Sequence, residues 1–269
     1  MRIGNKKTFL LIGTSNSLEN SIYWKSLIQS DEGFSIELLI KLINLEEKLV
    51  FWDVGANSGV FSMLVKYTVP NATIVAFEPS KISCEKFVSN CKLNNYSYSE
   101  ANYNEISTKS ILIFQNALSS NSETLELKYL SSISNFTYGG KIVESNVGVL
   151  RTEKIQSITA SQLINSNKGL IPNFIKIDIE GHEDHALRGF GDFLQELKVI
   201  LIEILDDDIA KKIEKLLDPG MYRYFDINDQ SRKVVEYEHL KQSSSRNWFI
   251  VRRNQELMLN LLKSQNVDV

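Results

Sequence analysis

Short runs of consecutive apolar residues alternate along this chain with longer segments whose apolar positions recur every three or four residues. The short runs lie near 49–54, 73–78, 110–115, 173–179 and 198–204, and the helical patterns near 59–68, 80–93, 183–195 and 207–217. Such runs are typical of buried strands, and their alternation with helices is typical of βαβ units. The pattern predicts a doubly wound, mainly parallel α/β sheet.

The end of the chain departs from this alternation. Two further apolar runs, near 221–227 and 246–252, are joined by a polar connection without a strong helical pattern. Two consecutive strands at this point predict a sheet of seven strands with one antiparallel strand near the C-terminus.

A second departure lies between Asn121 and Ser157. The apolar residues of this segment alternate with charged ones at Leu125, Glu126, Leu127, Lys128 and Tyr129, which predicts a half-buried strand. A second strand is expected at about 149–156, after a polar, glycine-ended loop over 131–140. We therefore expect an inserted β-hairpin that borders the active-site cleft.

Amphipathic segments also flank the sheet. Two of them, at about 18–29 and 35–46, predict N-terminal helices at the sheet edge or over the mouth of the site, and leucines after Arg253 predict a short terminal helix. We accordingly divide the chain into an N-terminal helical extension over 1–48, one α/β domain over 49–252 and a C-terminal tail helix over 253–269.

Composition limits the possible functions. The 269 residues suffice for one large domain, and a net charge of −3 without a basic patch argues against a nucleic-acid partner. The apolar runs are too short to span a membrane. Cys84 and Cys91 lie seven residues apart on a predicted helix, about 10.5 Å along its axis, which exceeds the reach of a disulfide. Reduced thiols are consistent with a cytoplasmic protein.

Two strand ends carry the features of a nucleoside site. The first predicted strand runs into a turn that reads Asp53-Val-Gly55-Ala-Asn57-Ser-Gly59, and the second ends at Glu78. Glycines allow the backbone to pass close to a ligand, and an acid one βα unit later is well placed to accept hydrogen bonds from ribose hydroxyls. The third strand ends at Asn116 and Ala117, which we expect near a base.

A later strand ends on a cluster of acids, in the sequence Lys176-Ile-Asp178-Ile-Glu180-Gly-His182-Glu183. Acids at this point lie at the carboxyl edge of a parallel sheet, where open α/β sheets bind their ligands. Glu183 is also explained by the first turn of the next helix, which favours acids. His182 is the strongest candidate for a general base near neutral pH.

The glycine spacing helps to choose the ligand. A nicotinamide site needs G-x-G-x-x-G to hold a pyrophosphate, and that spacing is absent here. Asp53 would in addition place negative charge beside the pyrophosphate. Acidic surroundings suit a ribose-bearing ligand with a cationic centre and an ammonium group, and S-adenosylmethionine carries all three.

Together these motifs resemble the FkbM family of S-adenosylmethionine-dependent methyltransferases. The resemblance covers roughly Val50 to Val251 and includes the smaller motifs at 90–94, 116–119 and 187–189. It implies a class I, Rossmann-like methyltransferase fold. Where the family usually has Thr-Leu-Asp, this chain has Thr159-Ala-Ser161, and we expect Ser161 to cap the following helix as Asp would.

The predicted site follows from the motifs and the resemblance. We expect cofactor contacts from Asp53, Gly55, Asn57, Gly59, Glu78, Asn116 and Ala117, and catalytic roles for His182, Asp178 and Glu180. Asp53 has the alternative of bonding turn amides instead of ligand. No metal is expected, because the histidines and acids match no specific ligand template. Trp52 and Phe61 are expected in the core.

The predicted function is O-methylation of a hydroxyl on a sugar, glycan or natural-product acceptor, with S-adenosylmethionine as the cofactor. The partner is then a small molecule or a glycan, and the oligomeric state stays open. Two alternatives come from other classes. One is a protein that binds S-adenosylmethionine without transferring its methyl group, and the other is a nicotinamide-dependent oxidoreductase.

Overall fold

The computed structural model describes residues 33–100, 110–130, 142, 149–243 and 246–266, together with a pair of two-residue antiparallel strands, β1 (Arg2–Ile3) and β2 (Lys6–Lys7). The first predicted helix, near 18–29, and the hairpin loop over 131–140 lie outside the described residues. Within the described residues, no helix is both long and apolar enough to cross a membrane.

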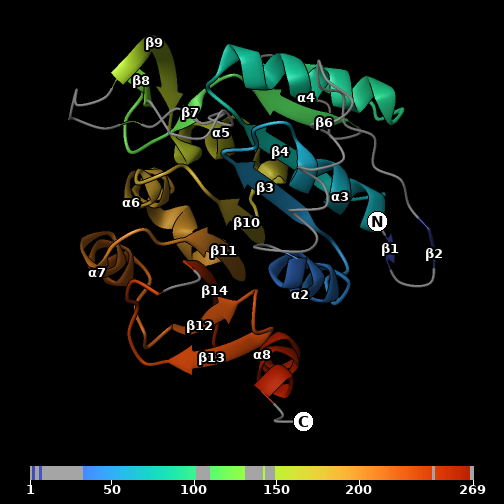
Figure 1. Ribbon diagram of the computed structural model, residues 1–269, viewed down its shortest axis with the longest axis vertical. Coiled ribbons are helices and arrows are strands. Elements are labelled where there is room, and N and C mark those ends of the chain that lie inside the picture. Colours follow the sequence, from blue (N-terminus) through green and yellow to red (C-terminus); the bar gives the residue numbers. More distant parts are fainter. Residues whose placement is uncertain are drawn as a thin grey trace.

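A mixed nine-stranded sheet runs through the molecule (Figure 1). Its seven central strands are those predicted, in the spatial order β6 (Ile111–Phe114), β4 (Thr73–Phe77), β3 (Val50–Val54), β10 (Phe174–Ile177), β11 (Val199–Glu203), β14 (Asn247–Arg252) and β12 (Tyr222–Asn228). Only β14 runs against its neighbours among these seven. The doubly wound α/β fold with an antiparallel strand near the C-terminus is thus confirmed.

Two edge strands were not predicted. β5 (Tyr98–Glu100) adds parallel to β6, and β13 (Lys233–Tyr237) adds antiparallel to β12. β13 occupies the segment that the sequence pattern indicated as a polar connection. In this strand Val234 is buried and Val235 is exposed, so one face packs and the other meets solvent. An edge strand this short carries too few apolar positions to stand out in the sequence.

Helices cover both faces of the sheet (Figure 1). One core lies under α2 (Gly33–Ile43), α3 (Val60–Thr68), α4 (Lys81–Leu93) and α8 (Glu256–Lys263). The other lies under α5 (Ala160–Ser166), α6 (Glu183–Arg188) and α7 (Asp207–Leu216). The described residues also contain three short 3₁₀ helices: η2 (Lys168–Leu170), η3 (Gly191–Glu196) and η4 (Ser264–Asn266).

Two predicted helices differ in detail. The helix expected at 183–195 ends at Arg188, and Gly191, with a φ of +53°, begins the separate η3. The prediction that Ser161 caps α5 was wrong, because Thr159 is the N-cap residue of that helix. The Thr159 side chain accepts from the amide of Gln162, and the Gln162 side chain accepts from the amide of Thr159. This reciprocal capping box satisfies two helix-end donors at once.

The expected insertion is an antiparallel hairpin of β8 (Thr124–Leu130) and β9 (Val149–Ile158). The short strand β7 (Ala117–Leu118) pairs in parallel with β9, which gives a separate three-stranded sheet. The hydroxyl of Tyr129 in β8 donates to Ser80 Oγ at 3.0 Å, just after the end of β4. The hairpin therefore reaches the edge of the main sheet at which the site was predicted.

The glycine turn between β3 and α3 is fixed by close backbone packing. The amides of Gly55 and Ala56 both donate to the carbonyl of Phe77, each at 3.0 Å. Gly55 has a φ of +78°, and a Cβ there would lie 2.0 Å from the carbonyl oxygen of Asp178. Gly59 has a φ of +82°, and a Cβ there would lie 2.0 Å from the Phe87 ring. Glycine is thus required by packing as well as by conformation.

Gly55→Ala is expected to lower the free energy of unfolding by about 2–5 kcal/mol, because the new Cβ adds a clash with a backbone carbonyl to the strain of a positive φ. Gly191→Ala is the matched control: its φ is also positive, but nothing lies within 4 Å of the added Cβ. It should cost only about 1–2 kcal/mol. Urea unfolding measures both variants, and equal losses would contradict the packing argument.

Candidate functional site

The candidate site is built on four parallel strands that end at one edge of the sheet. β3 contributes Asp53, β4 is followed by Glu78, β10 by Asp178, and β11 ends at Glu203. The in-register pairing of these strands aligns their carboxyl ends. Four carboxyl groups therefore lie at this edge of the sheet.

Glu78 connects the second strand end to the glycine turn. Its Oε2 accepts from the amide of Asn57 and its Oε1 from the amide of Ser80, both at 2.8 Å. The carboxyl is 7% exposed, and burial raises its pKa to about 7 against the effect of these two amides. Asn57 and Glu78, two predicted cofactor contacts, are thus in direct contact with each other.

Asp53 is fully buried below the turn. Its Oδ2 accepts from both the amide and the hydroxyl of Ser62 in α3, at 3.0 and 2.7 Å. Its Oδ1 has no hydrogen-bond partner among the described residues. Burial raises the pKa of Asp53, and the nearby cation of Lys176 opposes that rise. Asp53 thus hydrogen-bonds to Ser62 of α3 and not to the turn amides that the alternative named, and its contact with a ligand stays a prediction.

The end of β6 lies next to Glu78, because the amide of Glu78 donates to the carbonyl of Phe114 at 3.0 Å. Asn116 follows, and its side-chain amide donates to the carbonyl of Gln156 in the hairpin at 3.2 Å. Ala117 is buried in β7. Both residues lie where the main sheet passes into the hairpin, and their contact with a base stays a prediction.

Lys176 is a site residue that sequence reasoning missed. It lies within β10 opposite Asp53 of β3 and Leu201 of β11. Its ammonium Nζ is 3.0 Å from Asp178 Oδ2 and 4.9 Å from the centre of the Phe61 ring. The signal was a lysine between two isoleucines in a strand that is otherwise buried.

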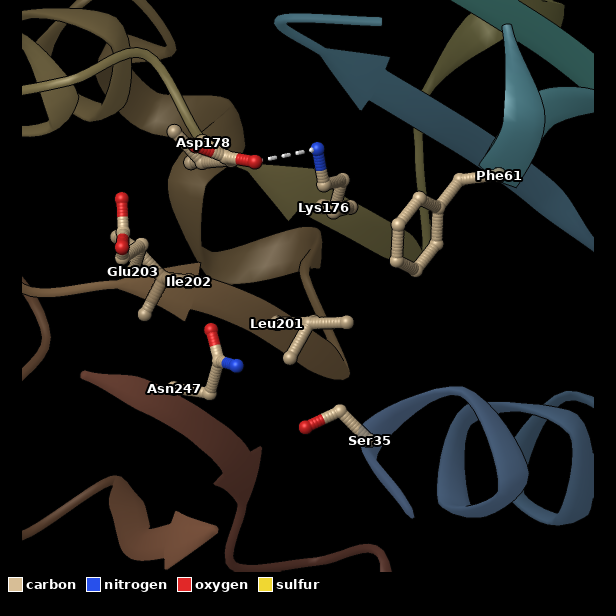
Figure 2. Close-up of a pocket in the computed structure, with 9 residues that line it drawn as sticks. Ser35, Phe61, Lys176, Asp178, Leu201, Ile202, Glu203 and Asn247 are labelled. Carbon is tan, nitrogen blue, oxygen red and sulfur yellow. Dashed lines mark hydrogen bonds and ion pairs between the residues drawn. The ribbon is translucent and has the colours of Figure 1, made fainter. Parts of the chain in front are cut away.

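A pocket opens beside the Lys176–Asp178 ion pair (Figure 2). Its floor and walls come from α2, α3, β10, β11 and β14, and the lining residues are Ser35, Phe61, Lys176, Ile177, Asp178, Leu201, Ile202, Glu203 and Asn247. Phe61 was expected in the core, and it is buried there, but its ring also borders this pocket. Trp52 is in the opposite core, as expected.

The α2 side of the pocket is anchored by Asp229, which follows β12. Its carboxylate accepts from the amide of Ser35 at 2.7 Å and from the Ser35 hydroxyl at 2.6 Å. The side-chain amide of Asn247 in β14 also donates to this carboxylate, at 3.3 Å. The start of α2 is therefore tied to the antiparallel end of the sheet.

Glu203 is a pocket residue whose acidity is strongly perturbed. Burial raises its pKa to about 8, and the charges of Asp178 and Glu180 act in the same direction. The guanidinium of Arg246, 4.0 Å away, opposes the rise. A carboxyl with this pKa exchanges its proton near neutral pH, which is the property of an effective general base.

The loop after β10 is held by Glu183. Its Oε1 accepts from the amides of Gly181 and Ile179, at 2.9 and 3.3 Å, and burial raises its pKa to about 7. Glu180 in this loop has a φ of +58°, which is uncommon for a residue with a side chain. Glu183 therefore has the structural role that its helix-start position indicated.

The structure does not bring His182 into the pocket. His182 precedes α6, its Nε2 is 2.9 Å from Ser119 Oγ, and its ring stacks on that of His185 with centroids 4.3 Å apart. Burial, and then the neighbouring His185, lower the pKa of His182 to about 4. Its role as a base stays a prediction without geometric support from the pocket.

Metal ligation was not expected from the sequence. Within the ranges that the structure describes, no group of three or more histidine, cysteine, aspartate or glutamate side chains could hold a metal ion. The expectation of chemistry without a metal stays a prediction.

Comparisons with known proteins identify relatives of this chain. The chain is 26% identical over 182 residues to the hexuronic acid methyltransferase AglP of Haloferax volcanii, across 68% of this chain and 66% of the relative. It is 28% identical over 165 residues to Methyltransferase 1 of Beauveria bassiana, across 57% of this chain and 64% of the relative. The chain thus matches just under two thirds of the length of each relative.

Among solved structures, the chain is similar to a putative caffeoyl-CoA O-methyltransferase from Staphylococcus aureus, with 9% identity, 88% and 92% of the two chains covered, and a TM-score of 0.47. A likeness of this size carries no functional argument. The family described as the methyltransferase FkbM domain matches residues 53–224, which include the glycine turn, Glu78 and the acids after β10. The chain belongs to the FkbM methyltransferase family.

Proposed function

We propose that this protein transfers the methyl group of S-adenosylmethionine to a hydroxyl oxygen of a sugar or glycan acceptor. The observation that carries the proposal is the convergence of Asp53, Glu78, Asp178 and Glu203 at one sheet edge, beside a glycine turn and a pocket. Burial raises the pKa of three of these carboxyls, Asp53, Glu78 and Glu203. A cationic ligand favours their ionised form, and this cofactor carries a sulfonium and an ammonium.

Each part of the cofactor can be matched with residues at this edge of the sheet. Glu78 would accept hydrogen bonds from the ribose, since each oxygen of a carboxylate can accept more than the one amide bond it now makes. Asn116 and Ala117 would border the adenine. Gly55, Asn57 and Gly59 would lie along the cofactor between its ribose and Asp178. Asp53 supports this arrangement from below through Ser62.

When bound, the cofactor supplies a methyl group that its sulfonium has already activated. The contribution of the chain is then alignment, which is worth about 7–11 kcal/mol in well-oriented reactions. A hydroxyl acceptor must also lose its proton, and a positioned base contributes about 10²–10⁴-fold. The chain has to provide both in the pocket between β10 and β11.

Glu203 is the best-supported proton acceptor. It lines the pocket, and its pKa of about 8 matches the demands on a base near neutral pH. Asp178 and Glu180 were candidates from the sequence: Asp178 is already engaged by Lys176, and both charges raise the basicity of Glu203. His182 would need to leave Ser119 to take the role.

The proposed acceptor class rests on the pocket and on one relative. A carboxylate and an amide, here Glu203 and Asn247, bond sugar hydroxyls, and an aromatic ring such as Phe61 packs on the apolar face of a sugar. The name of AglP states that it methylates a hexuronic acid. We further propose a cytoplasmic protein that does not bind nucleic acid, which is supported by two buried cysteines without a disulfide and a net charge of −3.

Cofactor binding is tested by calorimetry with S-adenosylhomocysteine and with NAD. S-adenosylhomocysteine should bind and, at 100 times its Kd, stabilise the fold by about 2.7 kcal/mol. Glu78→Ala should weaken that binding about 10–100-fold, because it removes charge-assisted hydrogen bonds to the ribose. Glu85→Ala, on the exposed side of α4, is the control and should bind normally. Binding of NAD alone would favour an oxidoreductase instead.

The base is tested by the pH dependence of kcat/KM. Because a base must be ionised, the rate should rise with pH and level off above the Glu203 pKa of about 8. The Glu203→Gln variant should lose the rise of kcat/KM with pH and should be about 10²–10⁴-fold slower. Glu214→Gln is the matched control, since Glu214 is similarly exposed but bonds Leu240 on the far side of α7. A Glu203→Gln enzyme with an unchanged profile would transfer the role to Asp178 or His182.

Transfer itself is tested with methyl-labelled S-adenosylmethionine and a panel of uronic acids and neutral hexoses, free and linked in glycans. Label is expected to appear on an acceptor oxygen, with one S-adenosylhomocysteine formed for each methyl group transferred. A protein that binds S-adenosylhomocysteine tightly but labels nothing across the panel would favour the alternative of a binding protein without transfer.

A further inference from the structure

Lys176 introduces a cation into a site otherwise dominated by acids. Among the described residues that line the pocket, it is the one with a positive charge. Its side chain is only 9% exposed, whereas that of Asp178, its partner, is 34% exposed. Both members of the ion pair line the pocket, and the Lys176 side chain is the more buried of the two (Figure 2).

The presence of a lysine at this buried strand position requires an explanation. The neighbouring positions on the same face of the sheet hold the apolar residues Phe51, Phe174 and Leu201, together with the buried carboxyl of Asp53 directly opposite Lys176. Burying an ammonium is costly unless it is paired, and replacing buried ion pairs by apolar residues is often neutral or stabilising. Stability alone therefore gives weak grounds for the Lys176–Asp178 pair.

Asp178 of the ion pair packs against the glycine turn. Its amide donates to the carbonyl of Val54, and its carbonyl oxygen is the atom with which a Cβ at Gly55 would clash. Burial raises the pKa of Asp53 and of Glu78, and the positive charge of Lys176 opposes both rises. Lys176 thus lines the pocket and also acts electrostatically on Asp53 of β3 and on the proposed ribose contact, Glu78.

The amino-acid end of a ligand is a zwitterion, and it is complemented by an anion and a cation placed side by side. Lys176 and Asp178 provide this arrangement with 3.0 Å between Nζ and Oδ2. An ammonium has three N–H donors, so it can hold Asp178 and a ligand carboxylate together. Charge-assisted bonds of this kind are stronger than neutral ones.

We propose that the Lys176–Asp178 ion pair is the receptor for the amino-acid end of S-adenosylmethionine, with Lys176 on its carboxylate and Asp178 on its ammonium. This inference rests on the proposed function. It makes Lys176 a binding residue that selects for the intact amino-acid end of the cofactor, and it leaves Glu203 as the carboxylate that faces the acceptor.

The test compares the binding of S-adenosylmethionine with that of its decarboxylated form, which keeps the sulfonium and the ammonium. The wild-type protein should bind S-adenosylmethionine about 10–100-fold more tightly, because only it can bond Lys176 through a carboxylate. Lys176→Met should reduce this ratio of affinities to near one, because it should weaken the binding of S-adenosylmethionine and leave the binding of the decarboxylated form unchanged. Calorimetry measures all four affinities.

Lys198→Met is the matched control. Lys198 is also a partly buried lysine in an ion pair, with Glu46 at 2.8 Å, but it precedes β11 at the opposite edge of the sheet. Its ratio should equal that of the wild-type protein. A Lys176→Met protein that still discriminates between the two ligands would show that Lys176 is only structural, and would overturn the inference.

The outcomes separate this inference from the proposed function. If the wild-type protein binds both ligands equally well, the carboxylate receptor is wrong while the proposed cofactor stands. If it binds neither, the proposed function fails and the inference fails with it. Should Lys176→Met not fold, as judged by circular dichroism, the wild-type ratio alone decides, and a ratio near one overturns the inference.

Discussion

The close approach of the glycine turn to the end of β10 is the contact on which the rest of the site depends. Gly55 passes so near the carbonyl of Asp178 that no side chain fits, while its own amide is held by Phe77 at the end of β4. Three strand ends are thereby fixed relative to one another. The carboxylates of Asp53, Glu78 and Asp178, which lie at these strand ends, are positioned by the sheet itself.

Much of the fold could be predicted from the sequence, because long apolar strands and amphipathic helices leave a strong periodic signal. The edge strands β5 and β13 carried too few buried positions to do so, and the cap of α5 could not be assigned, since Thr159 and Ser161 are both good capping residues. Strand ends and turns were located well, as the pairing of Asn57 with Glu78 illustrates. Side-chain direction was the missing information.

That missing information explains the differences within the site. His182 follows the acidic strand end closely in sequence, yet its ring points to Ser119, because the loop turns through Glu180 and Gly181, both with positive φ. Lys176 was overlooked because a single polar residue in a buried strand does not disturb the apolar pattern. Two residues that share a sheet face, such as Lys176 and Asp53, are recognised as neighbours only when the strand order and register are known.

Asp229 links the two ends of the domain by holding Ser35 of α2 against Asn247 of β14. The pocket wall on this side is therefore built by the first described helix and the last strand, whereas the glycine turn and Glu78 belong to β3 and β4. The two sets of residues are separate in sequence and share β10 as their boundary. Under the proposed function, changes in the terminal segments would alter the acceptor side of the pocket and leave the residues of the proposed ribose contact unchanged.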